Sequence, residues 1–247
     1  HTGVVYSMGK NDNFDYFLGI ADLIANAIQP EPRRVDGLSA KKVIAITAGD
    51  SHSHVITSDF EVWGWGRGFS IGDGTTSDAK IPKPIDLSAL GSQTPIQVCD
   101  GSSNGLILTK EGHVYGWGVT NDGSTGTGED DFNALRAPSH VRGTLSEGSG
   151  IHVIQISCMG TIAIALDENG GIHRWGTSTS MVKVVYPILV PLIHEGENLL
   201  DDNRVSRISA GNGYLLVETY PIPSCFGIRS DNSSACSGKG DCQGEDV

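Results

Sequence analysis

The stretch Val62-Trp63-Gly64-Trp65-Gly66 decides the fold, because it returns along the chain in recognisable form. Val114-Tyr115-Gly116-Trp117-Gly118 and Ile172-His173-Arg174-Trp175-Gly176 repeat its pattern, and Val5-Tyr6-Ser7-Met8-Gly9 is a degenerate copy. The copies stand at intervals of about 50 to 60 residues, a period typical of propellers and other repeat architectures. The sequence therefore predicts a repeat protein in which each unit carries one strand ending in Trp-Gly.

Further strands repeat in step with this signature. Before each Trp-Gly strand lie an apolar strand, a turn of small residues and a second strand, as in residues 43–49 and 54–57. Hairpin signals such as Glu111-Gly112 precede the Trp-Gly strand. A proline-marked segment follows it, for example Pro82-Lys83-Pro84-Ile85, and proline is tolerated only on an edge strand. Four short strands per unit predict an all-β fold, a β-propeller of four-stranded blades.

The repeats resemble those of the regulator-of-chromosome-condensation family over about residues 4 to 219. Ala48-Gly49-Asp50-Ser51-His52-Ser53 is similar to the start of the family's blade, and Phe17-Leu18-Gly19 with Pro32-Arg33-Arg34-Val35 is similar to its end. Met8 departs from the pattern, because it stands where the family has tryptophan. The resemblance implies a propeller, usually of seven blades, and, by analogy with the founding member, guanine-nucleotide exchange.

Three complete blades lie between two half-blades in residues 1–220. Residues 4–35 correspond to the second half of a blade and residues 204–219 to the first half. Either the two halves join into one split blade and close a four-bladed ring, or further blades precede His1. The family's usual seven blades favour the second arrangement. Only residues 16–28 have the pattern of an amphipathic helix, and they fall in a loop of the repeat.

Composition and charge exclude several classes of function. Glycine makes up 33 of 247 residues, about twice its usual share, which indicates many tight turns. The formal net charge is −12 and the 17 basic residues are scattered, so binding to nucleic acid is not expected. The chain has no apolar run of about 18 residues, so we expect no membrane insertion in this segment.

Residues 221–247 differ from the repeats and contain three of the five cysteines. Their spacing resembles the opening of an epidermal-growth-factor-like (EGF-like) module. The resemblance implies that Cys225 pairs with Cys242, and that Cys236 pairs with a cysteine beyond the chain end. Within this segment Asn232-Ser233-Ser234 is the only glycosylation sequon, so Asn232 is a candidate glycan acceptor in a secreted protein.

The other two cysteines lie in the repeats. Cys99 and Cys158 occupy nearly equivalent inner-strand positions in successive blades, which makes them a candidate disulfide. Two buried thiols that act as small apolar side chains are an equally good interpretation.

Catalytic and metal-binding patterns are not recognised in the sequence. His52 and His54 are two residues apart on a strand and share a face, but His52 fills a place that the repeat specifies, which favours a structural hydrogen bond. His113, His152 and His173 lie near strand starts and converge on nothing visible. We therefore expect no enzyme activity, no cofactor and no metal ion.

These observations predict a non-catalytic interaction or structural module of a larger extracellular or cell-surface glycoprotein. It would bind other proteins, or further copies or modules of the same protein, through propeller loops. An adhesive or filamentous assembly fits this interpretation. The alternative is a regulator similar to guanine-nucleotide exchange factors, against which the charge of −12 and the cysteine module both argue.

Overall fold

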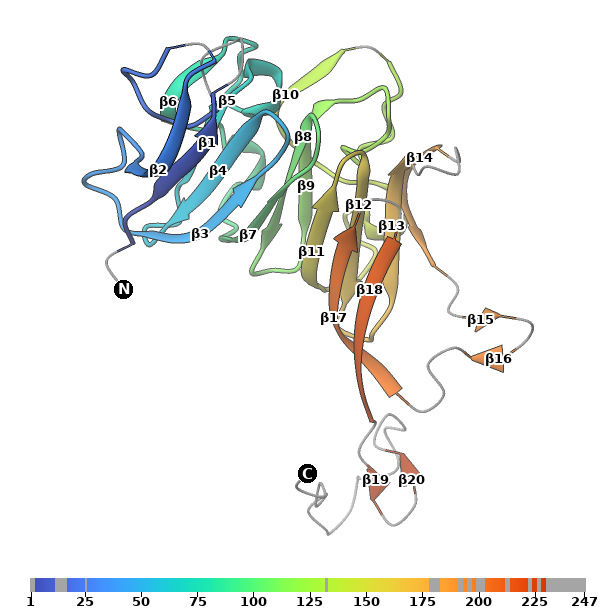
Figure 1. Cartoon of the computed structure of the whole chain (residues 1–247). Helices are drawn as coiled ribbons and strands as arrows, with labels where there is room; N and C mark the ends of the chain where they lie inside the picture. The colour runs from blue at the N-terminus through green and yellow to red at the C-terminus, as the bar shows by residue number, and fades with distance from the viewer. Residues whose placement is uncertain are drawn as a thin grey trace.

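The computed structural model is all-β within the part of the chain that it describes, with turns and three short 3-10 helices between the strands (Figure 1). The described residues are 3–11, 17–24, 26–131, 133–177, 183–190, 204–211 and 215–220, together with the backbone of 193–194, 197–198, 203, 214, 221, 224–225 and 228–229. The 3-10 helices are η1 (Gly68–Ser70), η2 (Ser88–Leu90) and η3 (Gly143–Leu145).

Three consecutive segments each form a four-stranded antiparallel sheet with its strands in sequence order. The first blade comprises β3 (Val43–Ala48), β4 (His52–Thr57), β5 (Val62–Gly66) and β6 (Ala79–Pro84). The second comprises β7 (Pro95–Asp100), β8 (Asn104–Thr109), β9 (Val114–Val119) and β10 (Ala134–His140). The third comprises β11 (Val153–Met159), β12 (Ile162–Asp167), β13 (Ile172–Thr177) and β14 (Lys183–Leu189). The predicted four-stranded units, with Trp-Gly on the third strand, are confirmed.

A two-stranded sheet lies at each end of this row. One pairs β1 (Tyr6–Lys10) with β2 (Ile28–Arg34), and the other pairs β17 (Asn203–Gly211) with β18 (Tyr214–Pro221). Figure 1 shows the two pairs at opposite ends of an arc, so residues 4–35 and 204–219 do not join and the four-bladed ring is not formed. Short pairs β15 (Ile193–His194) with β16 (Glu197–Asn198), and β19 (Ser224–Cys225) with β20 (Ile228–Arg229), complete the strands.

The innermost strands of successive blades, β3, β7, β11 and β17, lie against one another along the arc (Figure 1). The Gln97 side chain donates to the carbonyl oxygen of Ile156 at 2.7 Å and accepts from its backbone N–H at 3.0 Å. Gln155 makes the same two hydrogen bonds to Ile208, at 2.9 and 3.0 Å. Ala45 stands at the equivalent position of β3. Glutamine side chains therefore fix the register of the second and third interfaces, but not that of the first.

The tryptophans of the repeated signature join each blade to the unit before it. Each indole N–H donates to a carbonyl oxygen in the preceding loop: Trp65 to Phe17 at 3.0 Å, Trp117 to Ser70 at 2.8 Å and Trp175 to Ser124 at 2.9 Å. A glycine with positive φ stands two residues after each acceptor, and a side chain there would collide with the indole: Gly19, Gly72 and Gly126. The tryptophans are thus packing residues, as the repeat predicts.

The glycine that ends each signature shows which blade is incomplete. Its φ is +108° at Gly66, +107° at Gly118 and +91° at Gly176, a region that favours glycine. A side chain at Gly66 would meet the carbonyl oxygen of Ser51, in the loop between the first two strands of its own blade. Gly9 has a φ of +124°, but no described atom lies within 4 Å of its side-chain position. The half-blade β1–β2 lacks, among the described residues, the inner strands that pack there.

The helix suggested by residues 16–28 is not found where the chain is described. Residues 17–24 contain turns, including a hydrogen bond from the backbone N–H of Leu23 to the carbonyl oxygen of Ile20 at 3.3 Å. This segment instead supplies the Phe17 carbonyl oxygen that accepts from Trp65. In the described part of the chain, no helix has the length and apolar character needed to cross a membrane.

Candidate functional site

Two histidines and an aspartate meet between the first and second blades. His52 and His54 are two residues apart on β4 and share the face that turns toward β7, whose last residue is Asp100. The side chains of all three are 0% exposed. His52 was expected to make a structural hydrogen bond, but no pattern in the sequence indicated that His54 would face a buried carboxylate.

The hydrogen bonds of His54 define its charge. Its Nε2 lies 2.9 Å from the carbonyl oxygen of Ile71, which can only accept, so Nε2 carries a hydrogen. Its Nδ1 lies 2.8 Å from Oδ1 of Asp100. Burial lowers the pKa of His54, but the Asp100 charge and these two hydrogen bonds outweigh it, so that the pKa is raised. Without another cation, His54 is therefore an imidazolium ion paired with Asp100.

The Asp100 carboxylate is held as an anion in the same way. Burial alone raises its pKa, but the charges of His54 and His52 and the hydrogen bonds from both lower it to about 2. His52 Nε2 lies 3.5 Å from Oδ1 of Asp100 and 3.2 Å from the carbonyl oxygen of Asn104. Oδ2 of Asp100 and Nδ1 of His52 are buried without a described hydrogen-bond partner. The cluster thus holds more acceptor atoms than donors.

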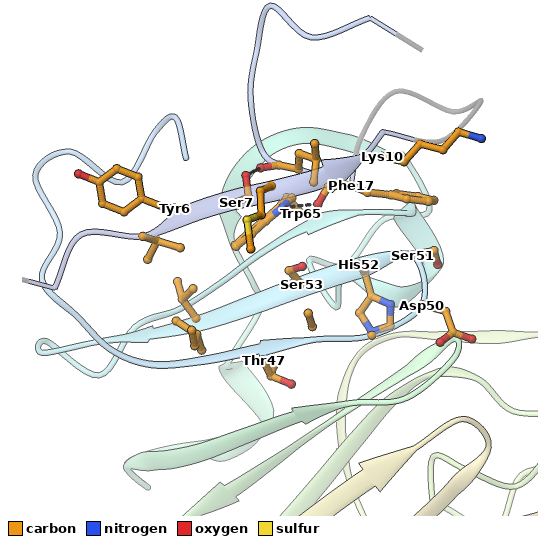
Figure 2. Close-up of a pocket in the computed structure, with 17 residues that line it drawn as sticks. Tyr6, Ser7, Lys10, Phe17, Thr47, Asp50, Ser51, His52, Ser53 and Trp65 are labelled. Carbon is orange, nitrogen blue, oxygen red and sulfur yellow. Dashed lines mark hydrogen bonds between the residues drawn. The ribbon is translucent and has the colours of Figure 1, made fainter. Parts of the chain in front are cut away.

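A groove of about 600 Å³ adjoins this cluster and separates β1 from the β3–β4 hairpin (Figure 2). Figure 2 shows Tyr6, Ser7 and Lys10 along β1, above His52 and Ser53 on β4, whereas Thr47 points away from β1, toward the second blade. Its apolar rim is exposed: Tyr6 is 59%, Met8 62% and Ile46 69% exposed. In the three complete blades the first two strands occupy the corresponding region.

Other histidines make contacts that the sequence did not predict. His173 Nε2 lies 2.9 Å from Oδ2 of Asp167, and its Nδ1 lies 2.7 Å from the hydroxyl of Thr144. His113 and His152 both line a smaller groove of about 330 Å³. Asp167 and His173 flank the Asn169-Gly170-Gly171 turn, and that spacing was the one available signal for their pairing.

The predicted cysteine and glycan sites fall partly outside the described residues. The structure joins Cys99 of β7 to Cys158 of β11 as a disulfide with a Cα–Cα distance of 5.6 Å. Whether the protein carries this bond or two thiols stays a prediction. Cys225 is described only as backbone of β19, and Cys236, Cys242 and Asn232 lie outside the described residues.

Comparison with known proteins identifies the repeats. Residues 2–56 match the model of the regulator of chromosome condensation (RCC1) repeat. The mouse E3 ubiquitin-protein ligase HERC2 is 32% identical over 211 residues, which is 81% of this chain but 4% of the ligase. The Arabidopsis thaliana ultraviolet-B receptor UVR8 is 29% identical over 151 residues, 60% of this chain and 32% of the receptor. The chain therefore spans a third or less of the length of these relatives.

Solved structures support the same fold. Human WBSCR16 superposes with a TM-score of 0.68 at 22% identity, covering 91% of this chain and 59% of that protein. Prp20p of Saccharomyces cerevisiae, a structure described with its binding to Gsp1p and histones, gives 0.67 at 15% identity, covering 90% and 55%. The chain is thus an all-β array of propeller blades. Its blades are repeats of the regulator-of-chromosome-condensation type.

The expected extracellular or cell-surface location is wrong. The relatives include an Arabidopsis thaliana RCC1 domain-containing protein of mitochondria, and the similar fold of Prp20p belongs to a histone-binding protein. These findings indicate proteins that act inside cells. The expectation rested on residues 221–247 alone, whereas the matches rest on the repeats. The glycoprotein, adhesive and filamentous context has no support from these relatives.

Proposed function

We propose that this chain is a non-catalytic protein-binding module that binds its partner through the loops of its blades. The observation that carries this proposal is the likeness of its repeats to those of the regulator of chromosome condensation, together with the fold shared with Prp20p, whose structure is described with its binding to Gsp1p and histones. The strand positions are used for packing, so the loops are left for binding. Phe60, which is 47% exposed on the turn between β4 and β5, is a candidate contact.

A partner with basic residues fits this chain. The net charge of −12 attracts positively charged groups to its surface. Phe60 adds a large apolar side chain to the proposed contact, and aromatic side chains are enriched at protein interfaces.

Site-directed photo-crosslinking tests the proposal. A photoreactive phenylalanine analogue is placed at Phe60, with a control at Tyr186, which is 46% exposed on strand β14. We expect Phe60 to crosslink one discrete protein in an extract of the source cells, and an excess of the native chain, but not of the Phe60→Asp variant, to abolish that adduct. Equal adducts at Tyr186, or equal competition by Phe60→Asp, would contradict a binding site at this turn.

An exchange-factor-like regulator is the second candidate. The observation in its favour is the mouse RCC1-like G exchanging factor-like protein, which is 31% identical over 159 residues, 60% of this chain and 32% of that protein. Release of a labelled guanine nucleotide from small GTPases measures this activity directly. A stimulated release that survives Phe60→Asp supports exchange, and an unchanged release rate excludes it for the GTPases tested.

We further propose that residues 221–247 form the start of a disulfide-bonded module similar to the EGF type, with Cys225 bonded to Cys242. The support is the cysteine spacing and the change of composition after the repeats. Peptide mapping of the unreduced full chain tests it: a Cys225–Cys242 linked peptide is the expected product. Three free thiols in this segment would contradict the module.

A further inference from the structure

Three potential ligand atoms converge in the cluster between the first two blades: His52 Nε2, His54 Nδ1 and a carboxylate oxygen of Asp100. These atoms all lie within 4.8 Å of one another, and the three residues are buried. We propose that they bind one divalent transition-metal ion of the zinc type, which joins β4 to β7 across the blade interface. The site lies between strands of two blades and does not rest on the proposed binding through loops.

The orientation of His54 favours a cation at this place. Because Nε2–H donates to the Ile71 carbonyl oxygen, the lone pair of Nδ1 faces Oδ1 of Asp100. Two electron-rich atoms 2.8 Å apart need a positive centre between them, either a proton or a metal ion. A histidine that donates its other N–H to a backbone carbonyl is also the usual arrangement around protein-bound zinc.

The distances suit a tetrahedral ion after small shifts. With bonds of 2.0–2.2 Å, the ligands of a tetrahedral zinc ion stand about 3.3 Å apart. His52 Nε2 and Oδ1 of Asp100 are 3.5 Å apart, and Oδ2 of Asp100 has no described partner and is available to share the ion. The Asn104 carbonyl oxygen lies 3.2 Å from His52 Nε2 and is the candidate for a fourth ligand.

The repeats show that this chemistry is confined to one interface. Strand pairing places Leu106, Ile164 and Leu216 at the position of His54, and Ala48, Cys158 and Ala210 at that of Asp100. His54 and Asp100 thus replace apolar or small residues together. Among the described residues, no second group of three histidine, cysteine or acidic side chains is close enough to hold an ion. The paired replacement is what a site shared between two blades requires.

Metal loading of the full chain tests the proposal. The protein is unfolded with a chelator, refolded without metal, and equilibrated with Zn²⁺ for stoichiometry or with Co²⁺ for its visible d–d absorption. His54→Leu with Asp100→Ala introduces the residues of the sibling blades and so keeps a foldable interface. The matched control is His173→Tyr with Asp167→Thr, which introduces sibling residues at the other buried His–Asp pair, where Thr144 occupies the second ring nitrogen.

We expect the native chain and the His173→Tyr/Asp167→Thr control to bind one more equivalent of Zn²⁺ than His54→Leu/Asp100→Ala. The Co²⁺ form should show tetrahedral d–d absorption without a thiolate charge-transfer band, which separates this site from binding by cysteines. If the native chain and His54→Leu/Asp100→Ala bind equal amounts of metal and give equal Co²⁺ spectra, the proposal is overturned and the cluster is a proton-bridged pair.

Discussion

The first and second blade interfaces use equivalent positions of the repeat for different chemistry. At the first, the Thr47 hydroxyl oxygen accepts from the backbone N–H of Asp100 at 3.1 Å, and the Asp100 carboxylate pairs with His54. At the second, the positions of Thr47 and Asp100 hold Cys99 and Cys158, which meet directly. The fold therefore determines which two positions are in contact. The residues at those positions determine whether the contact is polar or between two cysteine side chains.

This difference changes how the stability of each interface responds to a substitution. Leu106 stands at the position of His54 in the second interface and is fully buried, so a smaller side chain there loses packing in proportion to its size. At the first interface, removal of one charged partner leaves the other buried and uncompensated. The polar interface is consequently more sensitive to a single substitution, although the complete pair need not be more stabilising than an apolar contact.

The largest effect is expected from breaking the charged pair on one side. Asp100→Ala leaves the His54 imidazole without its counter-ion, and the free energy of unfolding should fall by about 3–5 kcal/mol. Chemical denaturation followed by tryptophan fluorescence measures it. In His54→Leu/Asp100→Ala the charge is removed completely, and the loss should shrink to about 1 kcal/mol. Equal losses in the two variants would show that the pair is not coupled.

Reduction of the second interface should have the next largest effect. If Cys99 and Cys158 are bonded, they close a loop with a sequence separation of 59, and reduction should lower the free energy of unfolding by about 2–4 kcal/mol. Thermal unfolding with and without a thiol reductant measures the change. A Cys158→Ala variant should not respond to the reductant. Alkylation of both cysteines in the unreduced, folded protein would instead identify two thiols.

The glutamine contacts that the first interface lacks provide a smaller test. Gln97→Ala removes two hydrogen bonds and leaves the buried backbone of Ile156 without partners, at a cost of about 1–3 kcal/mol. Gln29→Ala on β2, where the side chain bonds only to the nearby Glu31 carbonyl oxygen, should stay within about 0.5 kcal/mol of the parent in urea denaturation. A similar loss of stability in both variants would show that the two interface hydrogen bonds of Gln97 make no particular contribution.

The smallest effect belongs to a partly exposed ion pair, which serves as the reference for the buried one. Burial raises the pKa of Asp73, but its hydrogen bonds with Lys83 and Thr75 outweigh this and lower it. A lowered pKa stabilises the fold above the unfolded-state value near 4, and this contribution is lost as the pH falls through the folded-state value. Lys83→Ala should reduce stability at pH 7 by less than about 1 kcal/mol, and by less still at pH 3. A loss that grows toward low pH would contradict this sign.

The sequence predicted the blades well because their strands and turns are local and recur. A motif of five residues predicted three interfaces, at Trp65, Trp117 and Trp175. Each of these tryptophans is buried as expected. The His54–Asp100 pair was missed because its members are 46 residues apart, in different blades. A comparison of equivalent positions would have found it, since leucine, isoleucine, alanine and cysteine occupy those positions elsewhere in the repeats.

The indole hydrogen bonds give the array a direction. Trp65, Trp117 and Trp175 each donate to a carbonyl oxygen of the unit before, so each complete blade depends on the preceding unit for an acceptor. Removing a unit at the start of the array would leave an indole N–H without its acceptor. Removing a unit at the end would leave only a carbonyl oxygen without its donor, and water can satisfy that oxygen. Addition or removal of a blade should therefore have different effects on stability at the two ends of the array.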